Sequence, residues 1–261
     1  MSPMADIISR EPLTATPSSM VDRVVLILGV FEDSAEALTA GQISVRSGLP
    51  RSSVHRILQQ LEGARWLRRQ GHGYTLGLRV FEIGSLVVHR SRIAEAARPV
   101  AQALSERTGH VVHLAVLDQQ DVVYLDKVGG AYARALPSRV GGRLPAHCTA
   151  LGKALLAYSP PAVISQYLAA GLRRRTEASL ARPAALAAAL PSIRDAGYAA
   201  ERDEAVPGIG CVAAPVRSPD EVVAAVSVCG PADRVNTASH ELRHQVIQAA
   251  ADISRSLPGY R

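Results

Sequence analysis

The chain has 261 residues, and at about 100–200 residues per domain it forms one large domain or two modest ones. Hydrophobic residues make up 48% and charged residues 20%, which excludes a globally disordered protein because the chain can build apolar cores. There is no apolar run near the ~20 residues of a membrane helix and no signal-peptide core. The three cysteines contain no C-x-x-C pair. We therefore expect a soluble, cytoplasmic protein without a membrane partner.

The net charge of +6 is unevenly distributed. Residues 40–79 contain seven arginines and one acidic residue, Glu62, so this segment alone equals the net charge of the chain. Such a basic block attracts phosphate groups and gives salt-dependent affinity for nucleic acid. The remainder is neutral in sum, which indicates a separate domain with a different partner.

Residues 1–18 are expected to form a flexible tail, and residues 19–78 show a helix, helix, turn, helix, hairpin order. Ser19 and Thr39 are helix-capping residues, and Gly48 follows the second helix where a left-handed residue is favoured. This order is typical of a winged helix-turn-helix. The predicted elements are helices over 20–33, between Thr39 and Gly48, and over 50–63, and strands over 66–69 and 74–76.

Beyond this region the pattern changes to mixed helices and antiparallel strands, which predicts an α+β domain over residues 94–261. Residues 79–93 are expected to be a linker helix that packs on another subunit, because its apolar side chains lack local partners. Pro191 lies inside a helical pattern, so we expect a break or kink there. The predicted helices cover 78–89, 96–108, 149–158, 160–170, 182–196 and 239–257, and the strands 110–117, 122–128, 134–140, 198–202, 210–216 and 222–229.

Two short strings suggest enzyme chemistry. Residues 240–244 spell H-E-x-x-H, a zinc-protease signature, but no histidine follows, Asp252 is the one later acid, and the apolar stripe leaves both histidines on the wet face. His147-Cys148 suggests a thiol beside a base, yet adjacent side chains rarely point at each other, and a small buried cysteine is the plainer interpretation. We expect no catalytic residue, no metal and no cofactor. A metal or thiol enzyme with a regulatory head is one alternative.

Several short motifs occur in a characteristic order across both domains. They are GLPRSSVHRIL at 48–58, YTLG at 74–77, LPAH at 144–147, GKALLA at 152–157, CVAAPV at 211–216 and SVCGP at 227–231. With these motifs the chain resembles the IclR family of transcriptional regulators. The resemblance implies an N-terminal winged helix, a GAF-like effector-binding domain and assembly as homodimers or dimers of dimers. It also implies repression, which is the more frequent outcome in such families.

The third helix presents polar side chains away from its apolar stripe. Arginine and glutamine side chains can bind the edges of guanine and adenine in the major groove, and serine suits phosphate. We therefore expect this face to contact a double-stranded DNA operator, although a merely solvated polar face would have the same composition. The candidate DNA-binding residues are Arg51, Ser52, Ser53, His55, Arg56 and Gln59 on the helix, and Arg68, Arg69 and His72 in the hairpin.

The resemblance also implies an effector cavity in the second domain. Ser227 and Cys229 are two positions apart on one predicted strand, so they face the same side of the sheet. We expect a small, mostly apolar organic acid, with Ser227 and the amides after Thr149 as its polar contacts, while Glu201 disfavours a multiply charged anion. The alternative is an effector-independent DNA-binding protein whose large domain only oligomerises. The implied lining is Leu144, Ala150, Leu151, Glu201, Ile209, Cys211, Ser227 and Cys229.

Overall fold

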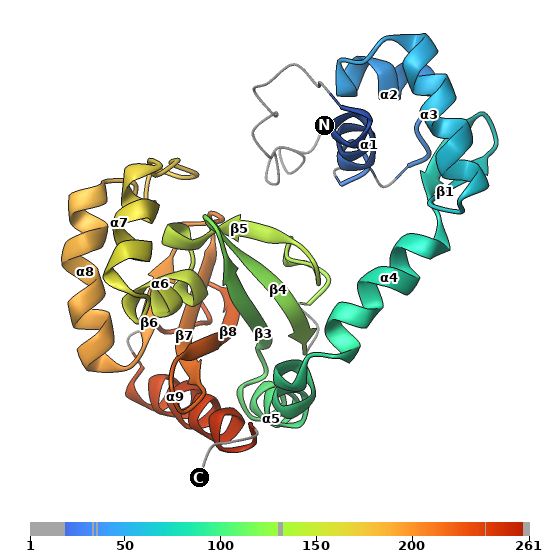
Figure 1. Ribbon diagram of the computed structural model, residues 1–261. Coiled ribbons are helices and arrows are strands. Elements are labelled where there is room, and N and C mark those ends of the chain that lie inside the picture. The colour runs from blue at the N-terminus through green and yellow to red at the C-terminus, as the bar shows by residue number, and fades with distance from the viewer. Residues whose placement is uncertain (1–18, 33, 35, 130–132, 238, 258–261) are drawn as a thin grey trace. The chain divides into compact units, whose positions relative to one another are not determined.

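The structure is a computed structural model that describes residues 19–32, 34, 36–129, 133–237 and 239–257. The predicted tail over residues 1–18 lies outside the described residues. The chain divides into two compact units, Met1–Arg90 and Ser91–Arg261 (Figure 1). Within the described part, no helix combines the length and the apolar character that a membrane crossing needs.

The first unit is built as the sequence predicts, from three helices and a two-stranded hairpin, followed by the linker helix α4. Ser19 and Asp22 form a capping box at the start of α1, and Thr39 and Gln42 form another at the start of α2. Gly48 ends α2 with a φ of 68°, which a residue without a Cβ adopts at little cost. The elements are α1 (Met20–Gly29), α2 (Ala40–Ser47), α3 (Arg51–Gly63), β1 (Leu67–Gln70), β2 (Gly73–Leu76) and α4 (Leu78–His89).

The core of this unit lies between the three helices and the hairpin. Val54, Ile57 and Leu58 on α3 are fully buried, which places the opposite face of α3 in solvent. A backbone bridge between Leu38 and Tyr74 ties the segment before α2 to the hairpin. The helix α3 and the hairpin are therefore parts of one packed unit.

The second unit contains a six-stranded antiparallel sheet of order β5-β4-β3-β8-β7-β6. Strands β3, β4 and β5 pair in chain order in one half of the sheet and β6, β7 and β8 in the other, and β3 and β8 join the two halves. The mixed α+β fold class is confirmed. The strands are β3 (Val111–Asp118), β4 (Asp121–Val128), β5 (Arg143–Pro145), β6 (Ala199–Arg202), β7 (Ile209–Arg217) and β8 (Val222–Pro231).

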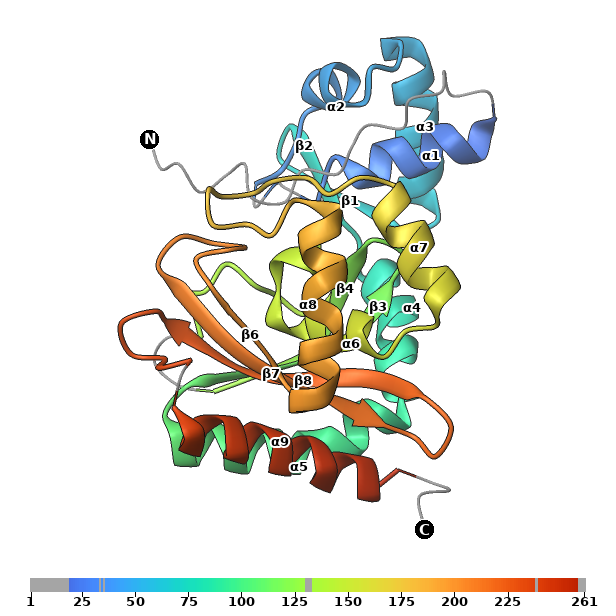
Figure 2. The ribbon, with the colours of Figure 1, turned by 90° about the vertical axis from the view of Figure 1, so that its left-hand side faces the viewer.

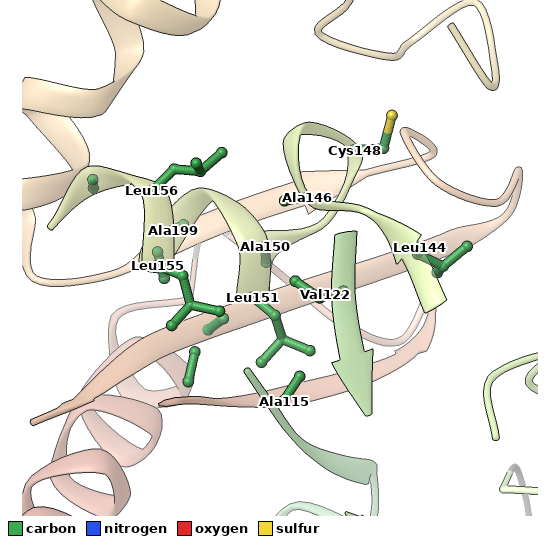
Figure 3. Close-up of a cluster of buried hydrophobic side chains, with 14 of the residues drawn as sticks. Ala115, Val122, Leu144, Ala146, Cys148, Ala150, Leu151, Leu155, Leu156 and Ala199 are labelled. Carbon is green, nitrogen blue, oxygen red and sulfur yellow. The ribbon is translucent and has the colours of Figure 1, made fainter. Parts of the chain in front are cut away.

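Helices cover both faces of this sheet (Figure 2). On one face, α5 and α9 lie side by side over a core that includes Val212, Val226 and Val228. On the other face, α6 packs with α7 and α8, and its leucines Leu151 and Leu155 extend toward the strands (Figure 3). The remaining elements are α5 (Arg92–Thr108), η2 (Ala146–Cys148), α6 (Ala150–Ala157), α7 (Pro161–Ala169), α8 (Pro183–Ala196) and α9 (His240–Arg255).

The strand predicted over residues 134–140 is wrong. These residues form turns, because Pro137 has no N–H for a ladder and the sheet edge is occupied by β5 instead. Arg143 holds β5 there through ion pairs with Asp118 and Asp121, at 2.7 and 3.1 Å. Of the break or kink predicted at Pro191, the break does not occur: α8 is one helix through this residue, and it packs on α6.

Candidate functional site

The solvent face of α3 carries the side chains predicted to contact DNA. Five of the six are exposed and Ser53 is half-buried. This follows from the 3.6-residue period, since the apolar stripe of α3 is buried on the opposite side. The exposed members are Arg51, Ser52, His55, Arg56 and Gln59.

The hairpin adds further positive charge. Arg68, Arg69 and His72 are exposed, with both arginines on β1 and the histidine in the turn. The Arg69 guanidinium lies 5.6 Å from the ring centre of Tyr74, which orients this side chain while leaving it accessible. In the first unit, a polar helix face and a positively charged hairpin are thus both exposed.

The second unit contains a cavity between the sheet and the start of α6. All eight residues predicted for the effector site line it. The strand register explains how they come together, because Cys211 lies opposite both Glu201 on β6 and Cys229 on β8. The side of the sheet that carries Ser227 faces α6, so Ala150 and Leu151 close the cavity from above. Figure 3 shows the Leu151 side chain extending from α6 toward the strands.

The sequence analysis missed a part of the cavity wall that includes the polar residues His113, Tyr124 and Ser138. The His113 ring is hydrogen-bonded to Ser138 Oγ at 2.8 Å and lies 5.0 Å from the ring of Tyr124. Burial lowers the pKa of His113 to about 3, with a smaller effect from the Lys127 charge, so its imidazole is neutral. Lys127 Nζ donates to the carbonyls of Leu136 and Ser138, and in this way holds the 136–138 loop against the cavity.

Part of this wall was accessible to sequence reasoning. His113 lies directly opposite Ser227 in the sheet, so strand alternation places it on the same face once β3 and β8 are known to pair. The 136–138 loop offers no such signal, because its position depends on the tertiary contact with Lys127. The full set of missed lining residues is His113, Tyr124, Leu136, Pro137, Ser138, Thr149, Ala205 and Val206.

Two groups in the cavity have unusual polar environments. Ser227 is 1% exposed, and its hydroxyl has no hydrogen-bond partner among the described residues. Glu201 is also buried, and this burial raises its pKa to about 7, although the Glu204 amide donates a hydrogen bond to its carboxylate and the Cys211 side chain is a further hydrogen-bond partner. A buried hydroxyl without a partner costs about 1–3 kcal/mol, which a ligand atom that binds it would recover.

The cavity is narrow in this structure. Its free space for water-sized molecules is about 40 Å³, enough for water but far below the ~300–1,000 Å³ of a typical small-molecule site. A ligand of several heavy atoms must therefore displace part of the wall. The 136–138 loop is one part of the wall with no strand or helix of its own, and polar contacts from Lys127 and His113 hold it in place.

The two motifs that suggested enzyme chemistry, His147-Cys148 and residues 240–244, do not have the geometry of a catalytic site. Both ring nitrogens of His147 are engaged, Nδ1 with Tyr167 Oη at 2.9 Å and Nε2 with the Arg173 carbonyl at 3.1 Å. Cys148 is fully buried and points away from the sheet (Figure 3). The histidines of the 240–244 string lie exposed on α9, and among the described residues no three His, Cys, Asp or Glu side chains gather in a metal-binding group.

Comparison with protein families gives two matches that together span most of the chain. Residues 85–255 match the family described as "Bacterial transcriptional regulator IclR C-terminal". Residues 20–71 match the "IclR helix-turn-helix domain". The second match contains α1, α2 and α3, and the first contains the whole sheet.

Individual relatives agree with these matches. The chain is 37% identical to the HTH-type transcriptional regulator XynR of Escherichia coli, over 92% of this chain and 97% of that protein. It is 29% identical to the transcriptional repressor IclR of the same organism, over 97% and 95% of the two chains. A crystal structure of an IclR homolog from Microbacterium hydrocarbonoxydans in complex with 4-hydroxybenzoate has a TM-score of 0.80 and 31% identity, over 92% of this chain and 99% of the other.

Proposed function

Because this chain belongs to the IclR family of bacterial transcriptional regulators, we propose that it represses transcription in the cytoplasm. In this proposal α3 and the hairpin bind the operator DNA. A small organic acid in the α6 cavity controls this binding. The proposal assigns the reading of bases to the exposed face of α3 and the binding of phosphates to the hairpin. It assigns no catalytic step to the chain.

Arg56 is the side chain best suited to test the DNA interface. It is exposed in the middle of α3, and a guanidinium that binds a guanine edge contributes about 1–3 kcal/mol of discrimination. The Arg56→Ala variant should lose about this much affinity for the operator and little for random DNA, measured by fluorescence anisotropy at several salt concentrations. Arg182→Ala, which removes an exposed arginine from the second unit, is the control. An equal loss on both DNAs would assign Arg56 to phosphate binding.

The linker helix α4 supports assembly as a homodimer. None of its residues is buried, and the large apolar side chains of Leu78, Phe81 and Val87 are each at least 67% exposed. Exposed apolar side chains of this kind are covered in symmetric oligomers by the same helix of a second copy, and a winged helix-turn-helix reads two half-sites as a dimer. We propose α4 as the dimer contact, with dimers of dimers as the larger assembly. Light scattering should show dimers or tetramers for the wild type and a shift toward monomer for Phe81→Glu; a wild-type monomer at micromolar concentration would refute it.

The unpaired Ser227 hydroxyl is the observation that carries the effector proposal. It is buried, lines the cavity and lies beside neutral donors, the Tyr124 hydroxyl and the His113–Ser138 pair. Burial raises the pKa of Tyr124, so its phenol keeps its proton. Neutral donors in an otherwise apolar cavity suit one carboxylate rather than several. The structural relative that holds 4-hydroxybenzoate supports an aromatic acid of this size.

Calorimetry with 4-hydroxybenzoate, benzoate and the neutral benzamide tests this assignment. Ser227→Leu removes the hydroxyl and fills the cavity, so it should abolish binding of the acids. Val228→Leu adds bulk on the same strand toward α5 and α9, and it should bind them as the wild type does. Unchanged binding in Ser227→Leu would refute the site, and benzamide binding as strongly as benzoate would refute the carboxylate.

A further inference from the structure

Two thiols face each other inside the cavity. Cys211 on β7 and Cys229 on β8 are directly opposite in the antiparallel register, and Cys211 Sγ donates to Cys229 Sγ across 2.8 Å. Residues opposite each other in such a pair have Cα atoms ~4.5–5.5 Å apart, within the ~4.4–6.8 Å that a disulfide spans. Both cysteines are free. The sulfurs must approach by less than 1 Å to reach the ~2.05 Å of a covalent bond.

The third member of this row is an acid. Glu201 on β6 lies opposite Cys211, and the Cys211 thiol is hydrogen-bonded to its carboxyl group. Hydrogen bonding to Cys229 and burial raise the pKa of Cys211, so the shared proton stays on Cys211 and the Cys229 sulfur is the acceptor. The remaining cysteine, Cys148, is not in the cavity lining.

We propose that Cys211 and Cys229 form a peroxide-reactive dithiol, a modification site at which a cross-strand disulfide closes inside the cavity. The pair needs no rearrangement of the fold, because β7 and β8 are already hydrogen-bonded neighbours. Its position in the cavity lining gives a small oxidant the same route as a small ligand.

Hydrogen peroxide oxidises the thiol pair in two steps. The Cys229 sulfur attacks one peroxide oxygen, the O–O bond breaks, and the leaving hydroxide takes the thiol proton, giving a sulfenic acid and water. Cys211 then attacks the sulfenic sulfur, so that the S–S bond forms and the S–O bond breaks. The hydroxide leaves with the Cys211 proton, which the Glu201 carboxylate relays, as a second water. Two electrons pass from the sulfurs to the peroxide.

The structural consequence is local to the cavity wall. A disulfide removes two S–H groups, draws the two sulfurs together and ends the hydrogen bond from Cys211 to Cys229. A ligand in contact with this wall meets a less polar surface, so oxidation should change its affinity. This consequence rests on the proposed effector site, whereas formation of the disulfide does not.

The test is thiol counting and mass spectrometry on the full chain after treatment with hydrogen peroxide. The wild type should lose two of its three free thiols and the mass of two hydrogens, peptide mapping should give a Cys211–Cys229 cross-link, and dithiothreitol should restore the thiols. Cys148→Ser should behave in the same way. Cys211→Ser should form no disulfide and should give a sulfenic acid at Cys229 that dimedone traps, while Cys229→Ser should give none.

Three outcomes would overturn the proposal. They are retention of all three thiols at peroxide concentrations that oxidise glutathione, a cross-link that includes Cys148, and a disulfide between chains on a non-reducing gel. A separate measurement compares calorimetric binding of benzoate by the oxidised and reduced protein. If benzoate binds neither form while the cross-link forms, the effector assignment fails and the dithiol stands.

Discussion

Replacing Glu201 by glutamine should stabilise the protein at neutral and higher pH. The Glu201 carboxyl group is 4% exposed, and its pKa is about 7 in the fold against an ordinary value of 4.5. The folded state therefore binds this proton more tightly than the unfolded state, and stability falls as pH rises from 4.5 to 7. The difference between the two pKa values corresponds to about 3 kcal/mol, which a neutral glutamine does not lose.

Urea unfolding at about pH 5 and about pH 8 measures this effect. Far-UV circular dichroism is the suitable signal, because the single tryptophan, Trp66, lies in the other unit. Protonation of His113, whose pKa of about 3 opposes stability at low pH, contributes equally to wild type and variant and cancels in their difference. Glu177→Gln, at a side chain that is 96% exposed, is the matched control and should change little. The reasoning fails if Glu201→Gln gains no stability at the higher pH, or gains as much at the lower one.

Three further predictions concern the cavity and the cores. Affinity for an organic acid should fall as pH rises through about 7, because ionised Glu201 repels a second carboxylate, and titration calorimetry across this range should show that decrease lost in Glu201→Gln. Gly152→Ala should lower the melting temperature markedly, since an added Cβ would lie 2.2 Å from the Ala146 carbonyl oxygen; a scan that matches the wild type would contradict this packing. Leu58→Ala should cost about 2–5 kcal/mol by opening a cavity in the first unit, and unaltered urea unfolding followed by Trp66 fluorescence would show that α3 packs differently.

The cavity under α6 shows which features the sequence pattern does not determine. The alternation along 222–229 places Ser227 and Cys229 on one face, and the structure agrees with this. How deeply that face is buried does not follow from the alternation. Burial of Glu201, and with it the shift of its pKa, depends on β6 lying at the sheet edge under α6 and the 203–206 turn. The facing thiols likewise depend on the β7–β8 register, which the whole sheet determines.

Local interactions account for the elements that the sequence by itself determined. The caps at Ser19 and Thr39, the left-handed Gly48 and the boundaries of α4 depend on residues a few positions apart, so their signals are complete within the chain segment. Residues 134–140 failed as a predicted strand because a strand needs a neighbour, and the edge belongs to β5 through the ion pairs of Arg143. Only the tertiary structure decided the strand order, the position of the 136–138 loop and the environment of each buried charge, since these depend on contacts between residues far apart in sequence. For a buried charge, the depth of burial rather than the residue type sets the free-energy cost.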